Sequence, residues 1–140
     1  MTIVCAPQDS AEWYYNEREC GSAIKDFMAE TGTAREEIYF VTKLKNNISY
    51  NATKKAIDKS LKACGLGYID LYLLHSAIGG PVVRRECWRA VCESKAEGKV
   101  KSIGVSNFGV GHLNEMLEQE VELPVLNQVY SIGISILATK

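Results

Sequence analysis

The sequence has no long apolar run and almost no excess of charge, and both absences limit what the chain can do. Its 140 residues include 16 Lys and Arg against 17 Asp and Glu, a formal net charge of −1. Nucleic-acid binding usually needs a broad basic surface, so we expect no nucleic-acid partner. No stretch approaches the roughly 20 apolar residues of a membrane span, so we expect no membrane association. Residues 1–6 are too short and too weakly charged for a secretory signal, which predicts a cytoplasmic protein.

The sequence also lacks the cysteine spacings of metal sites and disulfide frameworks. Its five cysteines form an odd set with no CxxC pair and no neighbouring histidine. We therefore expect neither a metal centre nor structural disulfides. Four of them lie in segments expected to be helical, where a free thiol commonly packs as a small apolar group: Cys20, Cys64, Cys87 and Cys92.

What the sequence does have is a regular alternation of short apolar runs and amphipathic stretches, with no repeat or flexible linker. The runs predict strands at residues 38–42, 68–74, 100–105 and 124–129, and the amphipathic stretches predict helices at 16–30, 51–64, 83–97 and 111–120. Helices of this length between strands are typical of parallel βα units with right-handed crossovers. We therefore predict an α/β fold in one domain over residues 1–140.

Glycines and apolar spacing define the first two helices. Gly32 and Gly65 are expected to end them, because glycine readily adopts the left-handed conformation found after a helix. The buried side of the first helix is expected to consist of Ala23, Ile24, Phe27 and Met28.

Polar residues suited to carbonyl chemistry follow the apolar runs at corresponding positions. In a parallel barrel the carboxyl ends of the strands form one face, and active sites are built there. These residues should therefore converge on a single site: Asp9, Tyr14, Lys43, His75, Ser106, Asn107 and Gln128.

Four of these residues could supply the proton chemistry of carbonyl reduction. Tyr14 could act as the acid that protonates the carbonyl oxygen, because a nearby ammonium such as that of Lys43 stabilises the phenolate left behind. A buried Lys43 would itself need a counter-charge, and Asp9 is a candidate. His75 could orient and polarise the carbonyl.

Three further residues could hold the carboxamide of a nicotinamide cofactor. Asn and Gln side chains both donate and accept hydrogen bonds, and Ser adds a hydroxyl, so Ser106, Asn107 and Gln128 suit an amide. Positioning a nicotinamide against its substrate is what a protein contributes to hydride transfer.

Several polar residues also have simpler interpretations. Ser106 and Asn107 could cap the next helix, with or without a role in binding a cofactor. Lys45 is interpreted as a solvated strand end and His112 as a surface residue. Asp70 precedes the histidine within a buried strand, where it is expected to support structure.

Taken together, these motifs resemble the aldo-keto reductase family. Residues 9–17, Asp-Ser-Ala-Glu-Trp-Tyr-Tyr-Asn-Glu, resemble its Asp-(Thr/Ser)-Ala-x-x-Tyr-x-Asn-Glu pattern, and residues 41–44 resemble its lysine strand. Residues 65–75 resemble the segment that ends in its catalytic histidine. Residues 98–108 and 127–129 resemble two further signatures. The resemblance covers residues 9–129 in the family's order, whereas residues 1–8 and 130–140 depart from the family pattern.

The resemblance implies a (β/α)8 TIM barrel that binds NADPH and reduces an aldehyde or ketone. By matching position it implies a catalytic tetrad of Asp9, Tyr14, Lys43 and His75. It also implies that Ser106, Asn107 and Gln128 hold the nicotinamide amide.

The length of the chain modifies these expectations. A (β/α)8 barrel takes about 250 residues, so 140 residues predict a partial barrel of about four to five βα units. Uncovered sheet edges then favour self-association. The alternative to a small-molecule reductase is a truncated, catalytically inactive remnant or interaction module that lacks the cofactor-binding C-terminal half.

Overall fold

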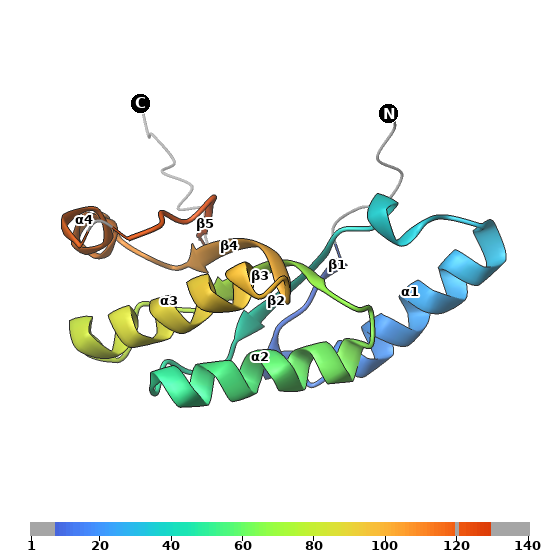
Figure 1. The fold of residues 1–140 in the computed structure, drawn as a ribbon, viewed down its shortest axis with the longest axis horizontal. Coiled ribbons are helices and arrows are strands. Elements are labelled where there is room, and N and C mark those ends of the chain that lie inside the picture. The colour runs from blue at the N-terminus through green and yellow to red at the C-terminus, as the bar shows by residue number, and fades with distance from the viewer. Residues whose placement is uncertain (1–7, 120, 130–140) are drawn as a thin grey trace, which may run out of the picture.

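The computed structural model describes residues 8–119 and 121–129, which contain one five-stranded parallel sheet (Figure 1). The strands pair in the order of the sequence, each with the next. Their bounds are β1 (Gln8–Asp9), β2 (Phe40–Leu44), β3 (Ile69–Leu74), β4 (Val100–Ser106) and β5 (Asn127–Gln128).

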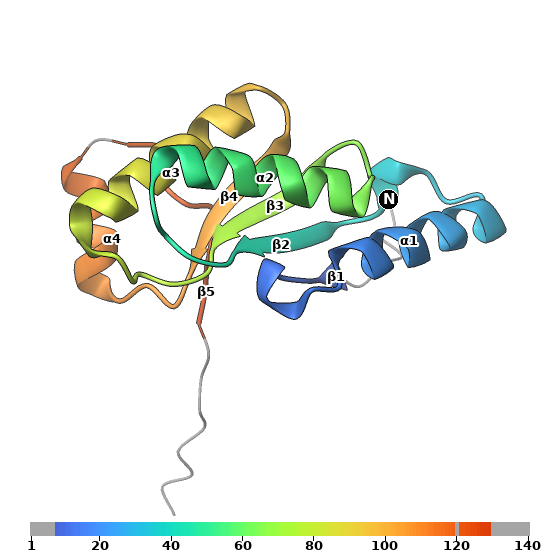
Figure 2. The ribbon, with the colours of Figure 1, turned by 90° about the horizontal axis from the view of Figure 1, so that it is seen from below.

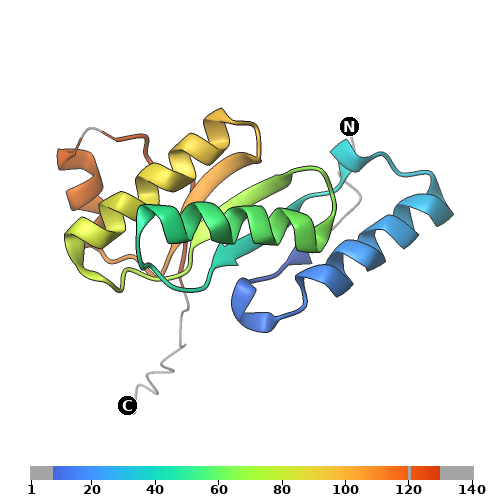
Figure 3. The same ribbon diagram turned by 60° about the horizontal axis from the view of Figure 1, so that its bottom comes forward.

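A helix connects each strand to the next, and α2 lies between α1 and α3 along one side of the sheet (Figures 2 and 3). The helices are α1 (Glu17–Thr31), α2 (Tyr50–Cys64), α3 (Gly80–Ala96) and α4 (Val110–Glu118), with short 3-10 turns η1 (Glu12–Tyr14) and η2 (Arg35–Glu37). Four βα units and a fifth strand confirm the prediction of a partial (β/α)8 barrel.

The predicted helix ends are confirmed where the local chemistry is strong. Gly32 and Gly65 follow α1 and α2 in the left-handed conformation, with φ of 73° and 62°, and their backbone N–H groups donate to Met28 and Leu61. At the start of α2, the Ser49 hydroxyl accepts a hydrogen bond from the backbone N–H of Ala52 at 3.2 Å.

Three predicted features differ from the structure. Helix α3 begins at Gly80 rather than at residue 83, because the first turn of a helix tolerates Pro81. Strand β5 covers two residues rather than the predicted 124–129. Ala23 and Phe27 are exposed on α1, which buries Ile24 and partly buries Met28 along a narrower side than predicted.

The main core lies between the sheet and its helices. It includes Phe40, Tyr72 and Ile103 from the strands and Ile57 and Val91 from the helices, all of them fully buried. Val41, Leu71 and Leu73 form a second, smaller cluster. Since side chains alternate between the two faces of a strand, this second cluster lies on the opposite face, inside the curve of the partial barrel.

The amino ends of β2 and β3 are joined through Arg35. Its guanidinium donates to the carbonyls of Leu66, Ile38 and Tyr68 and forms an ion pair with Asp70 at 2.6 Å. The Asp70 carboxylate also accepts the backbone N–H of Phe40 at 2.9 Å. This confirms that Asp70 supports structure.

Strand β1 lies at an edge of the sheet and contains Asp9. Gln8 pairs with Phe40 and Asp9 with Val41, so the segment before Tyr14 is part of the sheet. The other residues predicted to depart from the family pattern, 1–7 and 130–140, lie outside the described part of the chain.

Candidate active site

The predicted site residues lie at the carboxyl ends of the five strands. This end of the sheet is a different edge from its outer strands, β1 and β5. Lys43 is the fourth residue of β2, His75 follows β3, and Ser106 ends β4 with Asn107 after it. Asp9 ends β1, and Gln128 in β5 pairs with Ser106. Because every pairing is parallel, these positions share the edge where barrel active sites are built.

Tyr14, Lys43 and His75 lie together although they come from three different segments. The Tyr14 and His75 rings meet edge to face, with centroids 6.4 Å apart and planes at 87°. The Lys43 Nζ atom lies 5.6 Å from the centre of the Tyr14 ring. Lys43 is 2% exposed and Tyr14 is 51% exposed, so a buried lysine lies next to an accessible tyrosine.

The backbone around Ser10 helps to hold Lys43 in place. The Lys43 ammonium donates to the backbone carbonyl of Ser10 at 3.0 Å, in the segment between β1 and η1. The Ser10 hydroxyl in turn donates to the Asn16 side chain at 2.8 Å, just before α1. The predicted pairing of Lys43 with Asp9 stays a prediction.

The turn that presents Tyr14 is fixed by Glu12, which the sequence did not single out. The Glu12 carboxylate accepts the backbone N–H of Lys45 at 3.2 Å and the Lys59 ammonium at 3.1 Å. These contacts tie η1 to the end of β2 and to α2. Glu12 stands at an x position of the sequence pattern, so no motif marked it.

The predicted amide-binding residues also gather at this edge. The Ser106 hydroxyl donates to the backbone carbonyl of Gln128 at 2.8 Å, and the Asn107 backbone N–H donates to the same oxygen at 3.0 Å. The Asn107 side-chain amide donates to the His75 carbonyl at 3.2 Å. Asn107 has a φ of 57°, an uncommon conformation for a residue other than glycine.

Asn127 braces the turn that contains Asn107. Its side chain accepts the Phe108 N–H at 3.2 Å and donates to the Phe108 carbonyl at 2.8 Å. Phe108 is buried in the main core, so these two hydrogen bonds connect β5 to a core residue next to Asn107. The sequence indicated Gln128 but not the role of its neighbour.

Among the simpler interpretations, the helix cap was wrong, whereas Lys45 and His112 are partly exposed and each makes a contact that was not predicted. Lys45 is half-buried, with its ammonium 4.6 Å from the centre of the Tyr15 ring. His112 is half-buried, and its Nδ1 atom accepts the Gly109 N–H at 3.1 Å. Gly109 is the N-cap of α4, so Ser106 and Asn107 do not cap that helix.

Two other kinds of site are not seen in the described part of the chain. Within residues 8–119 and 121–129, no group of three or more His, Cys, Asp and Glu could hold a metal ion. None of the helices in those same residues is long and apolar enough to cross a membrane.

Comparison with known proteins identifies the family of the chain. The sequence profile described as the aldo/keto reductase family matches residues 7–133. An uncharacterized oxidoreductase of Schizosaccharomyces pombe is 51% identical over 122 residues, which are 86% of this chain and 43% of the relative. A glyoxal reductase of Bacillus subtilis is 41% identical over 122 residues, which are 86% of this chain and 42% of the relative.

A solved structure shows the same fold. The crystal structure of a Bombyx mori aldo-keto reductase in complex with NADP superposes with a TM-score of 0.82 at 32% identity. The match covers 89% of this chain and 43% of that one. The chain thus spans less than half the length of the relatives it matches. It belongs to the aldo/keto reductase family.

Proposed function

We propose that this chain provides the site of an NADPH-dependent reductase that converts an aldehyde or ketone to an alcohol. The observation that carries the proposal is the convergence of Tyr14, Lys43 and His75 from three βα units. An accessible phenol next to a buried ammonium suits proton transfer to a carbonyl oxygen, because the cation stabilises the phenolate that is left. Family membership supports carbonyl reduction in general terms.

In the proposed mechanism, Tyr14 donates a proton from its Oη atom to the substrate oxygen. The Lys43 ammonium stabilises the negative charge that the departing proton leaves on the phenol. His75, whose ring meets Tyr14 edge to face, orients the carbonyl so that its oxygen lies within reach of Oη. Asp9, at the end of β1, is proposed to support Lys43 as the fourth member of the tetrad.

The residues of β4 and β5 fit the amide of a nicotinamide. Ser106 and Asn107 place a hydroxyl and an amide side by side, with the Asn107 Nδ2 atom 3.1 Å from the Ser106 hydroxyl oxygen. With Gln128 on the neighbouring strand, they would hold the nicotinamide carboxamide. NADPH, when bound, supplies the hydride. The Bombyx mori relative in complex with NADP supports this choice of cofactor.

A small aldehyde is the substrate class to try first. The Bacillus subtilis relative, 41% identical, is named a glyoxal reductase, which supports a short dicarbonyl as the first compound to test. A cytoplasmic location accords with this proposal and remains a prediction.

Replacing Tyr14 tests the proposed acid. Tyr14→Phe should lower kcat for NADPH-dependent aldehyde reduction by about 10²- to 10⁴-fold, because it removes the proton donor and keeps the ring. Tyr15→Phe is the matched control, since Tyr15 is exposed next to Tyr14 and contacts Lys45 instead. Activity that survives Tyr14→Phe unchanged would remove Tyr14 from the acid role.

The second candidate function is an inactive remnant or interaction module that keeps the reductase motifs. It is favoured by the open sheet, since the described residues provide five strands whereas a closed barrel has eight. A folded chain that shows neither turnover nor saturable NADPH binding would favour this candidate.

A further inference from the structure

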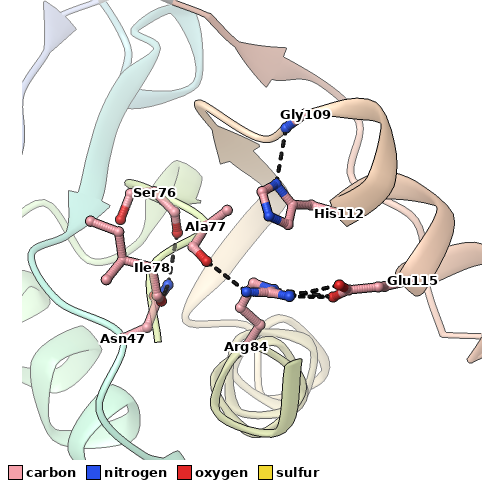
Figure 4. Close-up of polar contacts among 8 residues, drawn as sticks. All are labelled: Asn47, Ser76, Ala77, Ile78, Arg84, Gly109, His112 and Glu115. Atoms are coloured by element: carbon pink, nitrogen blue, oxygen red, sulfur yellow. Dashed lines mark hydrogen bonds and ion pairs between the residues drawn. The ribbon is translucent and has the colours of Figure 1, made fainter. Parts of the chain in front are cut away.

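The loop that follows His75 is held by side chains from outside it (Figure 4). The Asn47 side-chain amide donates to the carbonyls of Ser76 and Ile78, at 2.7 Å and 2.8 Å. The Arg84 Nη1 atom donates to the carbonyl between them, that of Ala77, at 2.8 Å. Three consecutive carbonyls are thus fixed by two side chains, one from before α2 and one from α3.

Glu115 of α4 fixes the orientation of the Arg84 side chain. Its Nε and Nη2 atoms donate to the two carboxylate oxygens of Glu115, with distances of 2.6 to 3.2 Å. A bidentate pair of this kind fixes the plane of the guanidinium, which directs the remaining arm toward the loop. The Arg84 side chain is 11% exposed and that of Glu115 is 34% exposed, so the guanidinium is largely shielded from solvent while its partner is partly solvated.

The start of α4, which carries Glu115, is fixed in turn by His112. Its Nδ1 atom accepts the Gly109 N–H, and its ring lies 5.7 Å from the Phe108 ring. The contacts therefore run from the β4–α4 turn through α4 and Arg84 to the β3–α3 loop. Asn47 holds the same loop from the β2–α2 side.

The hydrogen bonds that fix this loop also restrict the backbone of His75. Its first residue, Ser76, follows His75 directly, and the His75 carbonyl accepts the Asn107 side-chain amide at 3.2 Å. We propose that Asn47 and Arg84 are positioning residues that hold the backbone after β3, so that the His75 ring stays against Tyr14. This inference rests on the proposed function for the role of His75.

Asn47 and Arg84 together form a clamp on the loop. If the clamp positions His75, its loss should lower the rate of reduction more than the affinity for NADPH, whereas a purely structural role predicts no such difference. His75 would meet the carbonyl, whereas Ser106, Asn107 and Gln128 would meet the nicotinamide. Asn107 contacts the His75 carbonyl, but its own N–H is held by the Gln128 backbone carbonyl on β5, outside the loop. Loosening the loop should therefore disturb His75 and the reduction step and leave NADPH affinity near its original value. A general loss of stability would affect both.

The test compares Arg84→Lys and Asn47→Ala with matched controls. Arg84→Lys keeps the positive charge and removes the planar fork that binds Glu115 and Ala77 together. Arg89→Lys is its control, because Arg89 lies on the exposed side of the same helix and pairs with Glu86 at 3.2 Å. Asn46→Ala, at an exposed neighbouring position, is the control for Asn47→Ala. Glu115→Gln is a second variant should Arg84→Lys fail to fold.

Three measurements are made on the 140-residue chain: amide exchange of residues 76–79, the ring resonances of its two histidines, and steady-state kinetics with NADPH binding. We expect the clamp variants to speed exchange in the loop and lower kcat by about tenfold, the value of one or two hydrogen bonds. The His75 resonance, assigned with His75→Gln, should shift while NADPH affinity changes less than about twofold.

The proposal would be overturned if the clamp variants matched the control variants in loop exchange or in the His75 resonance. Equal losses of kcat and NADPH affinity in the clamp variants would also overturn it. If the unmodified chain shows no turnover, the proposed function fails. The clamp is then still decided by the exchange and the His75 resonance, because neither depends on activity.

Discussion

At the scale of single residues, burial raises the pKa of two thiols on the helices, those of Cys64 and Cys92. The four cysteines in the described residues are all free, and Cys64 and Cys87 are buried. Burial raises the pKa of Cys92 to about 11 and also raises that of Cys64. The thiols of Cys92 and Cys64 therefore stay protonated at neutral pH, as the interpretation of the cysteines as packing residues predicts.

These raised pKa values predict a loss of stability at alkaline pH. Between pH about 9 and about 11 the unfolded chain releases the Cys92 proton that the folded chain keeps, so the free energy of unfolding falls as the pH rises. Urea unfolding across this range should show the fall, and Cys92→Ala should show a smaller one. An identical fall in Cys92→Ala would contradict the prediction.

Single residues could be predicted from the sequence only where a motif gave them context. Asp70 was assigned correctly, because a carboxylate inside an apolar strand needs a partner, which proves to be Arg35. Lys45 and His112 are partly exposed, but the contacts that they make were not predicted. Their partners, the Tyr15 ring and the Gly109 N–H, depend on loop geometry that no spacing reveals.

At the scale of elements, the packing of α1 on α2 depends on a glycine. A Cβ atom at Gly21 would lie 2.0 Å from the carbonyl oxygen of Cys64 and 2.7 Å from its Cα atom. Both are backbone atoms at the end of α2, which cannot move aside as a flexible side chain could. The two helices can therefore approach this closely only where α1 has no side chain.

Gly21→Ala should force α1 away from α2 and destabilise the chain by about 1–3 kcal/mol or more, despite the better helix propensity of alanine. Ser22→Ala is the control, because Ser22 is exposed at the next position of the same helix. Chemical unfolding of both variants measures the difference. A Gly21→Ala chain as stable as Ser22→Ala would show that the contact does not restrain the helices.

Helices and strands were predictable where an apolar pattern was bounded by residues, such as glycine, that end regular structure. The apolar run of β3 and the glycines after α1 and α2 matched the structure within one or two residues. Strand β5 was predicted too long: the regular strand covers only Asn127 and Gln128, although the backbones of Val125 and Leu126 also hydrogen-bond to β4. Composition cannot show where pairing stops.

At the scale of the whole molecule, the sheet has two edges in its described part, β1 and β5. Large apolar side chains before and after β5 are exposed: Leu123, Val125, Leu126 and Val129. An uncovered edge next to apolar surface favours pairing with another chain. We therefore predict that the 140-residue chain self-associates.

Sedimentation velocity tests this prediction with two valine variants. Val125→Glu should shift the chain toward the monomer, because it places a charge beside the β5 edge. Val82→Glu is the control, since Val82 is equally exposed but lies on α3. A wild-type chain that sediments as a monomer at all concentrations, or equal effects of both variants, would oppose the idea.

The gathering of the site residues was predictable because it follows from topology. Parallel strands place their carboxyl ends at one edge, so polar residues after successive strands must meet. The supports of that site were not predictable. Asn47 and Arg84 reach loop carbonyls, and Glu115 reaches Arg84 from 31 positions away, through contacts that no local pattern encodes.

The central claim is that the strand ends form one NADPH-dependent carbonyl site, and titration of the chain with NADPH tests it most directly. We predict saturable binding of one NADPH per chain, followed by nicotinamide fluorescence. Binding should be about tenfold weaker in Gln128→Ala, which removes one amide partner. It should be unchanged in Asn114→Ala, an exposed site on α4. A folded chain that shows no saturable binding, or that binds equally well in Gln128→Ala, would contradict the account.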